Sequence, residues 1–160
     1  MRVLVTGAGG LLGSAFAALG EREGLSVTGA TRADLDVTDA SAVDAAIRPA
    51  RFDWVLHCAA YTAVDGAESD PEAARAVNAT GAGHVARAAA EAGAGLVMMS
   101  TDYVFHGPRR TPWRVGDRPR PGSVYARTKW AGERAARRAW RARAAWGAEP
   151  LVVRTGWLVG

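Results

Sequence analysis

The feature that most constrains this chain is a set of three evenly spaced glycines near its amino terminus. An apolar, β-branched segment, residues 3–5, reads as a buried strand and gives way to Gly7, Gly10 and Gly13, after which a helical pattern begins. A strand, a glycine turn and a helix start present free backbone N–H groups and a positive helix end to a phosphate. Gly7 would let the chain turn, Gly10 would leave room for a pyrophosphate, and Gly13 would let the helix lie close to the sheet. The G-x-x-G-x-x-G spacing alone leaves a ligand-free turn as the alternative.

The bulk composition limits the class of protein. A chain of 160 residues can bury one core, which predicts a single domain over residues 1–160. No segment approaches the length of a membrane span, and strand-like residues begin at once, so we expect no membrane association and a cytoplasmic protein. The formal net charge is +4, but the arginines concentrate in one late helix without a nucleic-acid motif. Anionic small molecules are therefore favoured as partners over nucleic acid.

Apolar runs alternate with helical patterns along the chain. Further strands are predicted at residues 25–30, 54–60, 96–100 and from 151 to about 157. A helix is predicted over residues 70–91, in which the polar Asn78 is expected to make an internal contact or hold a water. This alternation predicts an α/β fold with a doubly wound parallel sheet of the Rossmann type. In such sheets ligands bind beyond the carboxyl ends of the strands.

The residues after the second strand bear on the choice of cofactor. Sites that prefer NAD carry an acidic residue at the end of this strand, whereas this strand is followed by Thr31 and Arg32. A guanidinium group can hold a 2′-phosphate, which favours NADP(H) and leaves NAD(H) as the second choice. A solvated surface arginine is the other interpretation. Asp36 and Val37, which follow at the same edge, are placed to meet an adenine ring.

Acid–base chemistry is indicated by Tyr125 and Lys129, which lie four residues apart and so share one face of a helix. A cation beside the phenol would lower the pKa of the tyrosine towards the working range. The hydroxyl of Ser100 or of Thr101, at the end of the fourth strand, would point into the same crevice as the glycine turn. The long segment 106–122, rich in Pro, Gly and Arg, is predicted to be a functional loop.

Several blocks of residues follow one another in an order known from one group of enzymes. Residues 6–13, Thr-Gly-Ala-Gly-Gly-Leu-Leu-Gly, together with Tyr125-x-x-x-Lys129, resemble the extended short-chain dehydrogenase/reductase superfamily. The blocks at residues 59–65, 100–105, 124–133 and 154–157 resemble, more narrowly, the dTDP-4-dehydrorhamnose reductases. Two positions depart from that pattern: His57 stands where many members carry Asn, and Gly156 where Ser is frequent.

The resemblance implies an NADPH-dependent oxidoreductase that reduces the C4 ketone of a dTDP-linked 6-deoxy-4-ketosugar, in dTDP-L-rhamnose or related deoxysugar biosynthesis. It implies that Tyr125 donates the proton, that Lys129 holds the nicotinamide ribose and tunes the phenol, and that Thr101 hydrogen-bonds the ketone. Together with the glycine turn, it predicts cofactor contacts from Gly7, Gly10, Leu11, Leu12, Gly13, Arg32, Asp36, Val37, Ala60, Tyr61, Thr62 and Lys129. The expected substrate contacts are Thr101, Asp102, Tyr103 and Trp157.

The length of the chain leaves alternatives open. Members of the family continue into a carboxyl-terminal substrate domain, so we expect a chain truncated before that domain, and its activity alone is left open. Another nucleotide-sugar reductase or epimerase of the superfamily is the nearest alternative, and a non-catalytic NADP-binding regulatory domain is the alternative outside enzymes. Analogy alone adds a homodimer and Mg²⁺ as open expectations, and the residues themselves predict no metal site.

Overall fold

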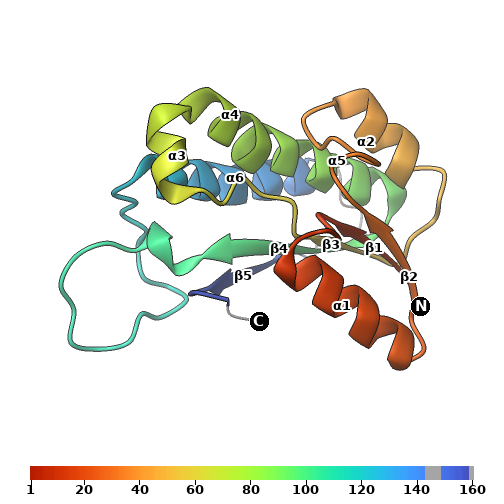
Figure 1. The fold of residues 1–160 in the computed structure, drawn as a ribbon, viewed down its shortest axis with the longest axis horizontal. Coiled ribbons are helices and arrows are strands. Elements are labelled where there is room, and N and C mark those ends of the chain that lie inside the picture. Colours follow the sequence, from red (N-terminus) through yellow and green to blue (C-terminus); the bar gives the residue numbers. More distant parts are fainter. Residues whose placement is uncertain (143–148, 159–160) are drawn as a thin grey trace.

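The computed structural model describes residues 1–142 and 149–158 and shows a parallel sheet between layers of helices (Figure 1). The strands are β1 (Arg2–Thr6), β2 (Ser26–Ala30), β3 (Trp54–His57), β4 (Gly95–Thr101) and β5 (Leu151–Thr155). They lie in the order β2-β1-β3-β4-β5, and every neighbouring pair is parallel. The predicted α/β fold with a doubly wound parallel sheet is confirmed.

Helices cover the two faces of the sheet unequally. The helical segments are α1 (Leu11–Arg22), α2 (Ala40–Ile47), α3 (Val64–Ser69), α4 (Pro71–Arg75), the π-helical η1 (Ala76–Gly81), α5 (Ala82–Ala92), the short 3₁₀ segment η2 (Asp102–Val104) and α6 (Val124–Arg141). Figure 1 shows α1 on one face, and α2, α5 and α6 on the other. None of the helices within residues 1–142 and 149–158 has the length and apolar character that a membrane crossing needs.

The core follows this unequal division. Leu4, Val55 and Met98 point from the strands into the larger apolar cluster, where they meet Ile47 of α2 and Val85 of α5. A smaller cluster on the α1 face is built on Val3, Val5 and Leu56, with Phe16 of α1 packed against it. Fully burying one such side chain stabilises the fold by roughly 1.5–3 kcal/mol. Alternate residues of β1 therefore serve opposite faces, as a strand covered on both sides requires.

Some element boundaries differ from the sequence prediction. The strand predicted over residues 54–60 ends at His57, because the chain then leaves the sheet and runs along the cavity described below. The helix predicted over residues 70–91 forms as α4, η1 and α5 in succession, with the unpredicted π-helical stretch at its centre. There α6 comes close: a Cβ on Gly132 would lie 2.0 Å from the carbonyl oxygen of Asn78. The π-helical turns of η1 thus coincide with a close contact to α6, and local sequence propensity cannot predict such a contact.

The order of the strands reverses direction between β1 and β3. The chain passes from β1 to β2 on one side and then returns to β3 on the other side of β1. The Thr6 hydroxyl and His57 Nδ1, 2.8 Å apart, hold the carboxyl ends of β1 and β3 together. Burial, and secondarily Lys129, lowers the pKa of His57 to about 3, so this ring is neutral and serves as a strut. A crevice at such a reversal is where parallel α/β sheets bind ligands.

Candidate active site

A cavity of about 710 Å³ opens at the carboxyl end of the sheet, along the reversal between β1 and β3. Every residue predicted to contact cofactor or substrate lines it. They are Gly7, Gly10, Leu11, Leu12, Gly13, Arg32, Asp36, Val37, Ala60, Tyr61, Thr62, Thr101, Asp102, Tyr103, Tyr125, Lys129 and Trp157. The structure therefore brings these segments, which are distant in sequence, to one place, and the individual roles stay predictions.

Two of the three glycines in the turn are required by the fold itself. Gly7 has φ +70°, and a Cβ there would lie 2.6 Å from the backbone nitrogen of Ala59. A Cβ on Gly13 would lie 2.4 Å from the carbonyl oxygen of Gly7, which shows how closely α1 approaches the turn. A Cβ on Gly10 would meet only the Gly7 oxygen, at 3.4 Å, a distance that real side chains adopt. The packing of the protein therefore does not require glycine at position 10, and Gly10 lines the cavity.

The helix that begins at this turn has an open amino terminus. Gly10 occupies the N-cap position of α1 without a side-chain cap, and the first turn contains no acidic residue. By contrast Asp39, Asp70 and Ser123 cap α2, α4 and α6 with their side chains. The first N–H groups of a helix have no partner within it and carry its positive dipole end. At α1 these groups border the cavity, which suits a phosphate.

The far end of the cavity, past β2, carries Arg32 and Asp36. Arg32 is exposed, and its charge contributes to holding the pKa of Asp36 low, after the hydrogen bonds from Thr38. Thr38 donates to Asp36 Oδ1 from its backbone nitrogen at 2.9 Å and from its hydroxyl at 2.7 Å. Asp34, the acid nearest the end of β2, instead accepts two hydrogen bonds from Thr31 and lies outside the cavity lining. A guanidinium group without a competing strand-end carboxylate therefore borders this end.

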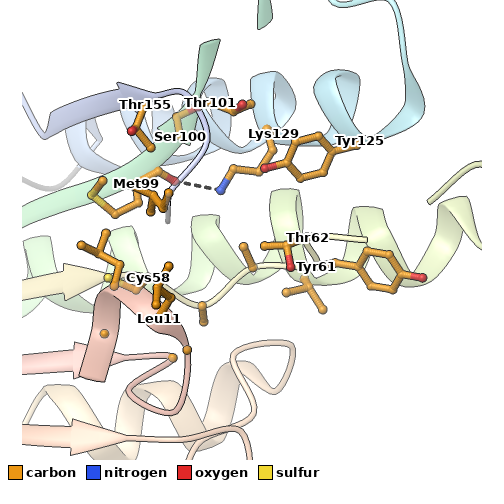
Figure 2. A pocket seen from close by; sticks show the side chains of 18 of the residues that line it. Leu11, Cys58, Tyr61, Thr62, Met99, Ser100, Thr101, Tyr125, Lys129 and Thr155 are labelled. Atoms are coloured by element: carbon orange, nitrogen blue, oxygen red, sulfur yellow. Dashed lines mark hydrogen bonds between the residues drawn. The ribbon is translucent and has the colours of Figure 1, made fainter. Parts of the chain in front are cut away.

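The opposite end of the cavity holds Tyr125, Lys129 and Thr101 (Figure 2). Lys129 is 4% exposed, and its ammonium donates a hydrogen bond to the carbonyl oxygen of Met99 at 2.8 Å. Burial lowers the pKa of Lys129 to about 8, against an opposing effect of Glu133. Figure 2 shows Tyr125 beside Lys129, across the cavity from Leu11 and Thr62.

The prediction that Lys129 lowers the pKa of Tyr125 is wrong for the protein on its own. Burial raises the pKa of Tyr125, and a hydrogen bond with the Thr101 side chain only partly opposes this. The ammonium of Lys129 is directed to Met99, and no hydrogen bond joins it to the phenol among the described residues. Four-residue spacing placed both groups on one face but could not report which oxygen the lysine would find.

The structure separates the two hydroxyls at the end of β4. Ser100 donates its hydroxyl to the buried carboxylate of Glu133 at 2.7 Å, away from the phenol. Thr101 instead lines the same end of the cavity as Tyr125, and its side chain opposes the rise in the pKa of that phenol. Of the two candidates, Thr101 is therefore the one associated with Tyr125.

The mouth of the cavity is aromatic. The rings of Tyr103 and Tyr125 meet edge to face, with centroids 6.0 Å apart. The indole nitrogen of Trp157 donates to the Tyr103 hydroxyl at 3.0 Å, although the Trp157 side chain is 85% exposed. Flat apolar surfaces with hydrogen-bonding edges suit a sugar or a base.

Further residues hold this arrangement: Asn78, which was expected to make an internal contact or hold a water, and Glu133 and Arg154, which were given no role from the sequence. Asn78 accepts from the backbone nitrogen of Tyr61 at 2.9 Å and donates to its carbonyl oxygen and to the Thr128 hydroxyl, at 3.0 and 3.1 Å. The predicted internal contact of Asn78 is thus a clamp between the loop after β3 and α6. Glu133 and Arg154, paired beneath the site, were passed over, although Glu133 follows Lys129 by one helical turn.

A count of basic residues could have singled out Lys129. The chain has nineteen arginines and one lysine, and that lysine is residue 129. Lysine differs from arginine by a compact ammonium whose pKa shifts readily on burial. All the other basic positions counted here carry arginine, and the one lysine lies at the end of the cavity where such a group has chemical use.

No group of three or more His, Cys, Asp or Glu side chains that could hold a metal ion is found within residues 1–142 and 149–158.

Comparisons with known proteins identify similar chains. Residues 1–160 match the family model described as "RmlD substrate binding domain". The dTDP-4-dehydrorhamnose reductases of Mycobacterium tuberculosis H37Rv and Streptomyces griseus are 47% and 45% identical, over 98% and 99% of this chain and 50% of each relative. The crystal structure of the Bacillus anthracis dTDP-4-dehydrorhamnose reductase in complex with NADP matches with a TM-score of 0.89 and 36% identity, over 99% of this chain and 54% of that one. The chain thus spans about half the length of the curated relatives it matches.

Proposed function

Because this chain belongs to the family of the dTDP-4-dehydrorhamnose reductases, we propose that it carries the cofactor site and the acid–base residues of an NADPH-dependent reductase. The substrate class is a dTDP-linked 6-deoxy-4-ketosugar, whose C4 ketone is reduced to an alcohol. Residues 1–160 form the cofactor-binding domain of this enzyme. Since cofactor and substrate are both nucleotides, the reaction belongs in the cytoplasm.

The lining residues fit NADPH in size and chemistry. The open N–H groups of α1, with Gly10 in front of them, would hold the pyrophosphate, and Arg32 would hold the 2′-phosphate. Asp36 and Val37 would border the adenine. Lys129 would hold the nicotinamide ribose. When bound there, NADPH supplies the hydride for the ketone carbon.

The chain supplies the proton for the ketone oxygen. Because burial raises the pKa of Tyr125, the phenol keeps its proton at neutral pH and can donate it as negative charge develops on the oxygen. The Thr101 hydroxyl, at the same end of the cavity, is placed to share that charge through a hydrogen bond.

The observation that carries this proposal is the placement of Tyr125, Thr101 and Lys129 in the same cavity that the glycine turn lines. A purely regulatory NADP-binding domain would have no use for a complete acid–base group at that point. An epimerase or reductase of another nucleotide sugar would use the same residues, so the sugar is decided by experiment.

The test is a substrate and cofactor panel on the whole protein. We expect NADPH consumption with a dTDP-linked 4-ketosugar, and a product in which the C4 carbon carries a hydroxyl and the hydrogen of the cofactor. A matched UDP-linked 4-ketosugar should react much more slowly. Turnover of the UDP sugar alone, or epimerisation without net cofactor consumption, would replace this proposal by its nearest alternative.

A further inference from the structure

A buried charged group lies directly behind the reactive end of the cavity. Glu133 of α6 is fully buried, and its carboxylate accepts hydrogen bonds from Ser100 at 2.7 Å and from Arg154 Nε and Nη2 at 2.9 and 2.7 Å. We call Glu133, Arg154 and Ser100 the Glu133 cluster. An ionised carboxylate is expensive to bury unless it is paired and hydrogen-bonded, and here the three bonds meet that requirement.

The partner of Glu133 has to be arginine. The Arg154 guanidinium gives the carboxylate two hydrogen bonds and also lies over the ring of Phe105, 5.0 Å from its centroid. The Trp130 ring, at 5.7 Å, contacts the same guanidinium. Only a planar guanidinium can bind two oxygens in its plane and stack with its faces, because a lysine ammonium is a point donor. The position of the Arg154 guanidinium is therefore fixed by Glu133 and Trp130 of α6 and by Phe105, which follows η2.

The cluster is continuous with the acid–base residues. Glu133 follows Lys129 by four residues, so both side chains leave the same face of α6. Lys129 bonds the carbonyl of Met99, and the next residue of β4, Ser100, bonds Glu133. Together with Arg154 of β5, these bonds tie the carboxyl ends of two strands to the helix that carries Tyr125.

Glu133 is also the buried anion that Lys129 faces. The titratable and charged groups around Lys129 are Tyr125 and Glu133 on α6, His57 and Cys58 at the end of β3, Asp102 and Tyr103 after β4, and Arg154 on β5. His57 is neutral, and burial raises the pKa of Cys58 to about 11, so its thiol is neutral too. Asp102 is exposed. Within the described part of the chain, Glu133 is thus the only buried carboxylate near the ammonium.

We propose that Glu133 is a positioning residue of the reduction: its carboxylate, held rigid by Arg154 and Ser100, keeps the buried ammonium of Lys129 charged and in register with Tyr125 and the end of β4. The inference rests on the proposed function for its catalytic meaning. Its physical content, an electrostatic coupling of Glu133 to Lys129, can be measured without substrate.

The experiment follows the titration of Lys129 by NMR with isotope-labelled lysine. As the only lysine of the chain, it gives one side-chain signal from these residues, which Lys129→Arg identifies by its loss. Glu133→Gln removes the negative charge and should move the titration midpoint about one pH unit towards acid. Arg154→Met removes a positive charge and leaves Glu133 to Lys129, so the midpoint should move towards alkali. The two variants break the same ion pair, so a merely structural role of the pair would not shift the Lys129 midpoint in opposite directions.

Matched controls come from an exposed ion pair between Arg141, at the end of the same helix, and Glu149, just before β5. Arg141→Met and Glu149→Gln break an ion pair between side chains that are 70% and 47% exposed, and neither should move the midpoint. If a single variant of the cluster does not fold, the double variant Glu133→Gln/Arg154→Met leaves no unpaired buried charge and should fold better than Arg154→Met. Its midpoint should lie between those of the two single variants.

Activity of the whole protein supplies the second readout. Glu133→Gln should move the alkaline limb of kcat towards acid by the same interval, whereas the KM for NADPH at low pH should stay within about twofold of wild type. Unmoved or equal shifts in the lysine titration of both variants would overturn the inference. Lack of ketone reduction by the unsubstituted protein would instead overturn the proposed function, and the titration would still report on the coupling.

Discussion

The glycine turn and the inner face of α6 border the same cavity, but they are built by opposite means. At the turn, side chains are absent: Gly7 and Gly13 have no room for a Cβ, and the amino terminus of α1 offers bare N–H groups. On α6, ionisable side chains are buried: Lys129 and Glu133 are 4% and 0% exposed. The first region works through fixed sterics and dipoles, which pH does not alter. The second works through buried charges whose protonation states depend on each other, so its chemistry should respond to pH and to substitution of either residue.

The largest difference between the regions should appear on removing one oxygen from the α6 side. Tyr125→Phe in the whole protein takes away the proposed proton donor without changing the glycine turn. We expect kcat to fall by roughly 10²–10⁴-fold, the usual contribution of a general acid. NADPH affinity, measured by calorimetry, should stay within about twofold of wild type. Ketone reduction at near wild-type rate would show that the proton comes from another group.

The pH dependence of stability should separate the regions next. The pKa of Lys129 is lowered from 10.5 to about 8 in the folded protein, so between these values the unfolded chain binds more protons. The free-energy cost of burying this ammonium is therefore fully present below pH 8, and stability is gained as pH rises through that interval, by roughly 3 kcal/mol. Lys129→Met should remove this gain. Chemical denaturation of both proteins in the unliganded state at several pH values measures it, and parallel curves would contradict the assignment.

Two alanine substitutions divide the turn itself. Gly13→Ala forces a Cβ against the Gly7 carbonyl oxygen at 2.4 Å and should lower the free energy of unfolding by roughly 1–3 kcal/mol or more. Gly10→Ala, with its nearest contact at 3.4 Å, should leave stability within about 0.5 kcal/mol and instead weaken NADPH binding. Urea denaturation and calorimetry on the pair provide each other's control. Equal stability losses at both positions would mean that the cavity wall is not open at Gly10.

The smallest expected effect concerns the far end of the glycine-turn side. Arg32→Ala should weaken NADPH binding by roughly tenfold and NADH binding by much less, since only NADPH carries the 2′-phosphate. Arg22→Ala is the matched control, because Arg22 is an exposed arginine at the end of α1 and lies outside the cavity lining. Equal losses of affinity for NADPH and NADH would mean that Arg32 is a solvated surface residue, and the preference for NADPH would then have no support from this position.

The same contrast explains what the sequence could and could not predict. The glycine turn is a local motif, so its place and the uncapped start of α1 follow from a few consecutive residues. The choice between Ser100 and Thr101 did not follow, because it depends on Glu133, which lies 33 residues from Ser100. The direction of the Tyr125 pKa shift was wrong for the same reason: burial and the Met99 carbonyl, not helical spacing, decide it.

Element boundaries failed where tertiary contact decides them. The end of β3 at His57 and the π-helical stretch at Asn78 both serve the loop that Asn78 clamps, and periodicity has no signal for either. The helix α3, only six residues long, was too short to show a period. The parallel sheet and the common position of the site were predicted because alternating strands and helices leave few ways to arrange the chain.

A crystal structure of the protein with NADP⁺ bound would decide whether the two regions form one site. We expect the pyrophosphate on the N–H groups of Leu11 and Leu12, and the nicotinamide ring at the α6 end, with its reactive carbon facing a space within about 3–4 Å of the Tyr125 hydroxyl. A cofactor whose nicotinamide ring lies away from Tyr125 and Lys129, or whose pyrophosphate avoids the glycine turn, would contradict the proposal that this cavity reduces a ketone.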